Sequence, residues 1–114
     1  MKAPNELIGL FFHSRDAMHL THLNTTSFAE HKALGGYYDG ILDLTDKFTE
    51  VYFGRYKRLA ITIPEAKVEG AVEHLKGLQQ IIDAERGQYS SELQNILDEM
   101  LALINRTLYL LTLV

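Results

Sequence analysis

The sequence predicts an all-α protein built as a single four-helix bundle over residues 1–114, and three observations support this fold class. Apolar residues recur at the three- and four-residue spacing of helices along most of the chain. Only two prolines occur, and no Gly-, Ser- or Pro-rich run separates two domains. A length of 114 residues, 46% of them hydrophobic, suits one domain with one core, because typical domains have about 100–200 residues.

The first two helices are predicted from their boundary residues. One helix is expected over residues 5–23, because a proline precedes it and a polar run follows it. Ser27 and Glu30 have the spacing of a capping box, in which the serine hydroxyl accepts a hydrogen bond from the glutamate amide. We therefore expect the second helix to occupy residues 27–56.

The second half of the chain should contribute two more helices. Residues 57–63 are predicted to be an extended connection, because Ile61-Thr62-Ile63 within them favours β structure but has no partner strand. A helix-start pattern with Pro64 in the first turn predicts a third helix that continues to about residue 85, and Ser91 with Gln94 starts the fourth. The connection is short, about nine residues and at most about 30 Å when extended, so a plain up-down bundle and a crossover both remain open.

Composition and charge exclude several classes of function. The chain has no cysteine, which excludes disulfides, cysteine-ligated zinc, iron–sulfur clusters and thiol nucleophiles. Fifteen acidic against eleven basic residues give a net charge of −4, which argues against DNA binding. There is neither a signal peptide nor an uncharged apolar run of about 18 residues, so we expect a cytoplasmic protein without a membrane segment. Phosphate-binding loops and common hydrolase motifs are also missing.

One side of the predicted second helix is acidic. Carboxylates recur there at four-, three- and four-residue intervals, at Asp39, Asp43, Asp46 and Glu50. Such a stripe alone is typical of a solvated helix face. Three glycines lie on or beside it, at Gly35, Gly36 and Gly40. Because glycine in a helix costs about 1 kcal/mol relative to alanine, they indicate close approach of another helix. Ile8 and Phe12 also give the first helix a second apolar side. We therefore expect a homo-oligomer with antiparallel second helices.

Histidines cluster near the turn between the first two helices. His19 and His22 are neighbours on the first helix, and His31 follows across the turn. A lone histidine is usually a packed or solvated residue, but this cluster is able to hold a divalent ion. Asp46 lies 15 residues after His31, about 22 Å along one helix, so these two reach one ion only if an antiparallel second subunit supplies the carboxylates. Ligands of this kind, without sulfur, suit iron, manganese or zinc.

These residues resemble a family pattern. The corner formed by His22-Leu-Asn and Ser27-Phe-Ala-Glu-His31, with Asp46-Lys-Phe-Thr-Glu50 further on, is similar to the Dps-like branch of the ferritin-like superfamily. The resemblance implies a ferritin-like bundle that oxidises and sequesters Fe(II) at ferroxidase sites between subunits and protects against oxidative stress.

The same resemblance implies the ligands. His22 and His31 of one subunit would meet Asp46 and Glu50 of its mate. The corner is shorter than in the family, so His19 is an open alternative to His22. The alternative function is a non-enzymatic helical-bundle interaction protein, for example a phage or host accessory factor, that has lost the metal site.

Overall fold

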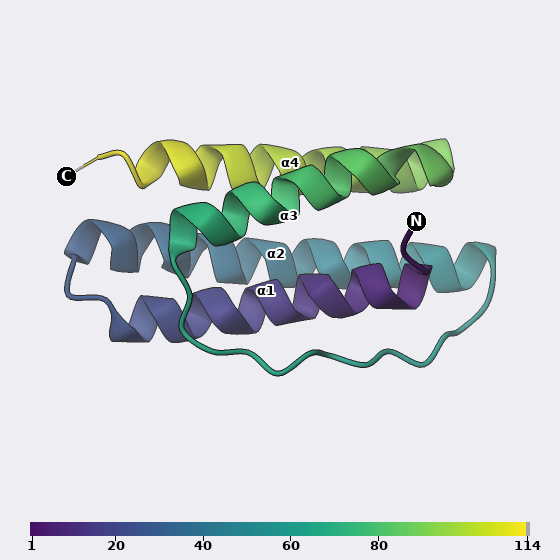
Figure 1. Cartoon of the computed structure of the whole chain (residues 1–114). Coiled ribbons are helices and arrows are strands. Elements are labelled where there is room, and N and C mark those ends of the chain that lie inside the picture. The colour runs from purple at the N-terminus through teal and green to yellow at the C-terminus, as the bar shows by residue number, and fades with distance from the viewer. Residues whose placement is uncertain (114) are drawn as a thin grey trace.

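The computed structural model describes residues 1–113 of the chain and is helical throughout its regular parts (Figure 1). Its helices are α1 (Pro4–Asn24), α2 (Phe28–Arg55), α3 (Ala71–Glu85) and α4 (Ser91–Leu110), with a short 3-10 helix η1 (Arg86–Gln88) between the last two. No strand occurs in the described residues. The prediction of an all-α, four-helix bundle is therefore confirmed.

The helix starts follow local chemistry. The Ser27 hydroxyl accepts from the Glu30 amide at 3.2 Å, which confirms half of the expected capping box at the start of α2. At the start of α1, the Glu6 carboxylate accepts from the Ala3 amide at 3.1 Å. These hydrogen bonds satisfy backbone N–H groups that have no partner within the helix, and they fix the ends of α1 and α2 close to the expected positions.

A long crossover, residues 56–70, joins α2 to α3, and we call this segment the strap. Figure 1 shows the strap running back along most of the bundle, so that α2 and α3 point in the same direction while α1 and α4 point the opposite way. The bundle therefore has the crossover topology and not the plain up-down one.

The predicted start of the third helix near residues 62–65 was wrong, because α3 begins only at Ala71. The bundle is 43 Å long. The 15 strap residues would cover only about 22 Å as a helix but reach about 50 Å when extended. Pro64 also disfavours helix at the residue before it. Spanning the bundle therefore requires the strap to stay extended.

The core is formed by buried side chains from all four helices. Phe48 of α2 is fully buried in this core, with edge-to-face contacts to Phe11 at 5.7 Å and to Tyr89 at 5.4 Å between ring centroids. Ile8 is fully buried within the single chain, so the second apolar side of α1 does not require a second subunit.

The strap is anchored on α1 at several points. Thr21 accepts a hydrogen bond from the Glu69 amide at 3.0 Å, and Asn5 donates to the Ala60 carbonyl at 3.3 Å. Between these points the Thr62 carbonyl oxygen lies directly against Gly9 of α1. The strap therefore follows α1 closely. This packing holds Glu69, which lies two residues before the start of α3, beside α1.

Candidate functional site

The structure brings the three predicted histidine ligands together at the α1–α2 corner. The rings of His22 and His31 stack with centroids 3.7 Å apart and planes 16° apart. Nδ1 of each ring bonds to the backbone carbonyl of the other residue. His19 lies next to this pair, with its ring centroid 6.0 Å from that of His22, and its ring stacks on Tyr38 with centroids 4.1 Å apart. The three histidines thus pack with each other, with Tyr38 and with the backbone.

The predicted carboxylate ligands lie elsewhere in the chain. Asp46 and Glu50 are exposed on α2, and neither makes an ion pair with any residue that the structure describes. Within residues 1–113, no group of three or more His, Asp or Glu side chains is arranged to hold a metal ion. A zinc or manganese site shared between two copies stays a prediction, since a single chain does not test it.

Two of the three glycines that indicated a second subunit are explained within one chain. A side chain at Gly35 would begin 3.2 Å from the His22 ring, and one at Gly40 would begin 2.9 Å from Leu103 of α4. These glycines permit close packing of α2 on α1 and on α4. They therefore no longer support the expected dimer through antiparallel second helices, which stays a prediction.

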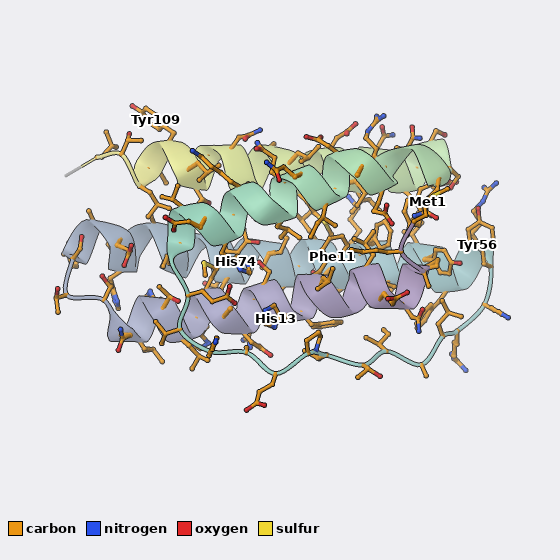
Figure 2. The ribbon with its side chains drawn as sticks, in the orientation of Figure 1. Met1, Phe11, His13, Tyr56, His74 and Tyr109 are labelled. Atoms are coloured by element: carbon orange, nitrogen blue, oxygen red, sulfur yellow. The ribbon has the colours of Figure 1, made fainter. Side chains whose placement is uncertain are left out.

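A polar network that the sequence analysis missed lies where the strap, α1 and α3 meet. Glu69 of the strap binds two imidazoles, through Oε2 to His13 Nε2 at 3.2 Å and through Oε1 to His74 Nδ1 at 3.3 Å. The other nitrogen of His74 lies 2.7 Å from the Ser14 hydroxyl, which lies 2.7 Å from the Tyr37 hydroxyl. Figure 2 shows His13 on α1 and His74 on α3 close to this junction.

The direction of these hydrogen bonds follows from the state of His74. Burial lowers the pKa of His74 below its ordinary value of 6.5, although the Glu69 carboxylate opposes the change. A neutral ring that donates from Nδ1 to Glu69 accepts at Nε2, so Ser14 donates to His74 and Tyr37 donates to Ser14. Burial also raises the pKa of Tyr37, which keeps its hydroxyl protonated as a donor.

The order Ser14, His74, Glu69 resembles a hydrolase triad, but its chemistry is different. Ser14 is fully buried, and its hydroxyl is engaged by His74 on one side and by Tyr37 on the other. A nucleophile must be accessible to its substrate, and the buried Ser14 hydroxyl is not accessible. The network therefore acts as a buried anchor that fixes the strap and α3 on α1.

A cavity of about 270 Å³ opens beside this network. Its polar lining consists of His13, Glu69, Glu73 and His74. Its apolar wall comes from Leu10, Leu78 and Ile81, with Gly77 between them. Because Glu69 is already bonded to both imidazoles, most of the polar groups of this cavity satisfy one another.

Exposed apolar side chains gather toward one end of the bundle, where α1 and α4 end and α2 and α3 begin (Figure 1). Of the ten exposed large apolar residues in the described chain, seven belong to this end, which we call the apolar end: Leu20, Leu23, Phe28, Val68, Val72, Tyr109 and Leu113. Phe28 is 75% exposed and Leu23 is 65% exposed. Figure 2 shows Tyr109 near the chain's C-terminus. In the described residues no helix is long and apolar enough to cross a membrane.

Comparison with known proteins gives a phage relative. The chain is 28% identical over 113 residues to an uncharacterized 14.6 kDa protein in the mobD-ri intergenic region of Enterobacteria phage T4. The similarity covers 96% of this chain and 88% of the relative. No solved structure matches the chain significantly.

The Dps-like resemblance, with its iron binding and ferroxidase activity, was wrong. Neither the family that matches the chain nor the phage relative points to Dps or ferritin-like proteins, and no metal-holding cluster occurs in the part of the chain that the structure describes. The motif has another physical origin, since His22 and His31 close a packed corner while Asp46 and Glu50 face solvent. A family model described as a family of unknown function, DUF5856, matches residues 22–111, and the chain belongs to this family.

Proposed function

We propose that this chain is a non-enzymatic interaction protein, an accessory factor of phage type, that works by associating through its apolar end. The phage origin of the T4 relative supports an accessory role. The observation that carries the proposal is the gathering of seven exposed large apolar side chains at one end of the bundle. Where such side chains form a continuous surface, they mark interaction sites in folded proteins.

The apolar end is not a consequence of a poorly formed core. Leu7, Phe11, Leu34 and Phe48 are fully buried, so the bundle has buried its interior side chains without Leu23 or Phe28. Placing Phe28 at the first position of α2 leaves its ring in solvent, where it contributes nothing to the core. A partner that covers these side chains would gain about 25 cal/mol for each Å² of apolar surface removed from water.

A second copy of the chain suits this surface as partner. Twofold contacts use the same patch on both subunits, so the patch must complement itself. Glu30 and Lys32 provide opposite charges within one turn of Phe28, and Lys32 Nζ lies 6.0 Å from the centre of the Phe28 ring. In a twofold contact the lysine of one copy faces the glutamate of the other around a shared apolar centre.

We also propose a ferritin-like connectivity for the bundle. The single long crossover between α2 and α3, which point in the same direction, supports it (Figure 1). This proposal concerns the fold alone and brings no iron chemistry with it.

Light scattering coupled to size exclusion tests the association. At about 50 µM, a concentration suited to a micromolar dissociation constant, the wild type should elute with the mass of a dimer or larger assembly. The variant Leu23→Asp/Phe28→Asp should elute as a monomer with unchanged helical circular dichroism. Ile63→Asp is the matched control, because Ile63 is an exposed apolar residue on the strap, away from the apolar end. A monomeric wild type, or a variant that associates as the wild type does, would contradict the proposal.

A further inference from the structure

A second cavity, of about 340 Å³, lies between the start of α2 and the end of α4. It is lined by Lys32, Ala33, Gly36 and Tyr37 from α2 and by Arg106, Thr107 and Leu110 from α4. The two helices run in opposite directions, so these two ends lie side by side (Figure 1). The cavity is at the lower end of the volumes of small-molecule sites, which are about 300–1,000 Å³.

The charged side chains that line this cavity are all positive. Lys32 and Arg106 line it from opposite helices, and no acidic residue is among its lining residues. Neither cation forms an ion pair within residues 1–113, whereas Arg55 and Arg86 pair with carboxylates of α4. Two cations that have no ion pair in the described residues therefore line one cavity of a chain that is acidic overall, with a net charge of −4.

The rest of the lining is shaped for a small apolar group. Ala33 and Leu110 contribute aliphatic surface, and Tyr37 contributes a side chain whose hydroxyl is bonded on its other side to Ser14. A side chain at Gly36 would meet no atom within 4 Å, so the chain itself does not use the space that this glycine leaves. Keeping glycine inside a helix costs about 1 kcal/mol relative to alanine.

We propose that this cavity binds a small organic anion, a carboxylate or phosphate group carried on a short hydrocarbon body. The guanidinium of Arg106 and the ammonium of Lys32 hold the anionic head with charge-assisted hydrogen bonds. The hydrocarbon body occupies the space above Gly36, between Ala33 and Leu110. The lining of the site comes from a single chain, and Lys32 is the residue that it shares with the surroundings of Phe28 at the apolar end.

Titration of the wild-type chain with four probes, followed by amide NMR shifts, tests the chemistry. Hexanoate and hexyl phosphate carry both the anion and the body, hexanol lacks the anion, and acetate lacks most of the body. We expect saturable shifts of α2 and α4 amides near the cavity with hexanoate, hexyl phosphate or both, and the preferred probe identifies the head group. No saturable binding of either anion, or hexanol binding as tightly as hexanoate, would overturn the proposal.

Matched variants locate the binding. Gly36→Leu should fill the cavity and weaken binding of the preferred anion about tenfold or more, whereas Gly54→Leu should not, although Gly54 is also a glycine of α2 with open space around it. Arg106→Gln should weaken binding to a similar extent through loss of a charged hydrogen bond, and Lys47→Gln should not. Arg106 is exposed, so its variant provides the test even if Gly36→Leu fails to fold. Unchanged affinity in Arg106→Gln would exclude the proposed site.

Discussion

The backbone carbonyl oxygen of Thr62 occupies the place where a side chain on Gly9 would begin. This contact lets the strap lie directly on α1, and it explains why a glycine occupies the middle of a helix at this position. The atoms that a side chain at Gly9 would meet belong to the Thr62 backbone. Rotation of a neighbouring side chain would therefore not relieve the contact.

Gly9→Ala should therefore destabilise the protein. Forcing a methyl group into this contact costs about 1–3 kcal/mol, and the better helix propensity of alanine returns about 1 kcal/mol. We expect a net loss of up to about 2 kcal/mol in the free energy of unfolding, measured by urea denaturation. Gly36→Ala is the control, because its side chain meets no atom within 4 Å, and it should gain up to about 1 kcal/mol. Equal effects of the two substitutions would exclude a special role for the strap contact.

Ser14→Ala should cost stability through groups that it leaves without partners. Tyr37 is fully buried, and its hydroxyl would lose the Ser14 hydrogen bond, as would His74 Nε2. An unsatisfied buried polar group costs about 1–3 kcal/mol. In a double-mutant cycle, Ser14→Ala with Tyr37→Phe should cost less than the sum of the single variants, because the second change removes the unsatisfied hydroxyl. Additive losses would show that the two side chains are not coupled.

Acid should weaken the fold through His74. The unfolded chain binds a proton on this ring near the ordinary pKa of 6.5, while burial lowers the pKa in the folded protein. Below pH 6.5 the unfolded state therefore binds more protons, so the free energy of unfolding falls as the pH decreases.

His74→Gln isolates this effect, because His13 and Glu69, the titratable groups that face the ring, are the same in both proteins. Urea denaturation at about pH 7.5 and about pH 5.5 brackets the ordinary histidine pKa. The wild type should lose more of its free energy of unfolding between these two values than the variant does. Parallel losses in the two proteins would mean that His74 is not the responsible group.

His31→Ala should destabilise the α1–α2 corner whether or not metal is present. The substitution removes the stack on His22 and the hydrogen bond from His31 Nδ1 to the His22 carbonyl, 2.9 Å long. We expect a loss of about 1–2 kcal/mol in buffer containing a chelator, from one hydrogen bond and one aromatic contact. Asp46→Ala should change stability by less than about 0.5 kcal/mol because Asp46 is exposed. A loss for His31→Ala that appears only when metal is added would contradict a purely packing role.

The helices could be predicted from the sequence because their ends are coded locally. Ser27 with Glu30 starts α2, and Ser91 stands at the predicted start of α4. The start of α3 could not be predicted in this way, because Pro64 is a good first residue of a helix. What keeps residues 56–70 extended is the 43 Å length of the bundle that they must cross, a property of the whole fold.

The functional residues were only partly predictable. The proximity of His22 and His31 followed from the short turn between them, but the pattern did not distinguish packing from metal binding. Ser14 lies on the same helix face as Leu7, Phe11 and Met18, which are buried. This spacing indicates that the Ser14 hydroxyl is buried and must form a hydrogen bond inside the protein. Its partner His74 lies 60 residues away and comes close only because the strap and α3 return to α1.

The central claim, association through the apolar end, is tested most directly by the distance between copies. The chain has no cysteine, so Asn24→Cys and Lys57→Cys each give one spin-label position, at the apolar end and at the opposite end of the bundle. Double electron–electron resonance measures the distance between the spin labels of two associated copies. For Asn24→Cys this distance should be shorter than the 43 Å length of one bundle, and for Lys57→Cys it should be longer than that length. A short distance from Lys57→Cys, or no dipolar coupling from Asn24→Cys, would contradict the account.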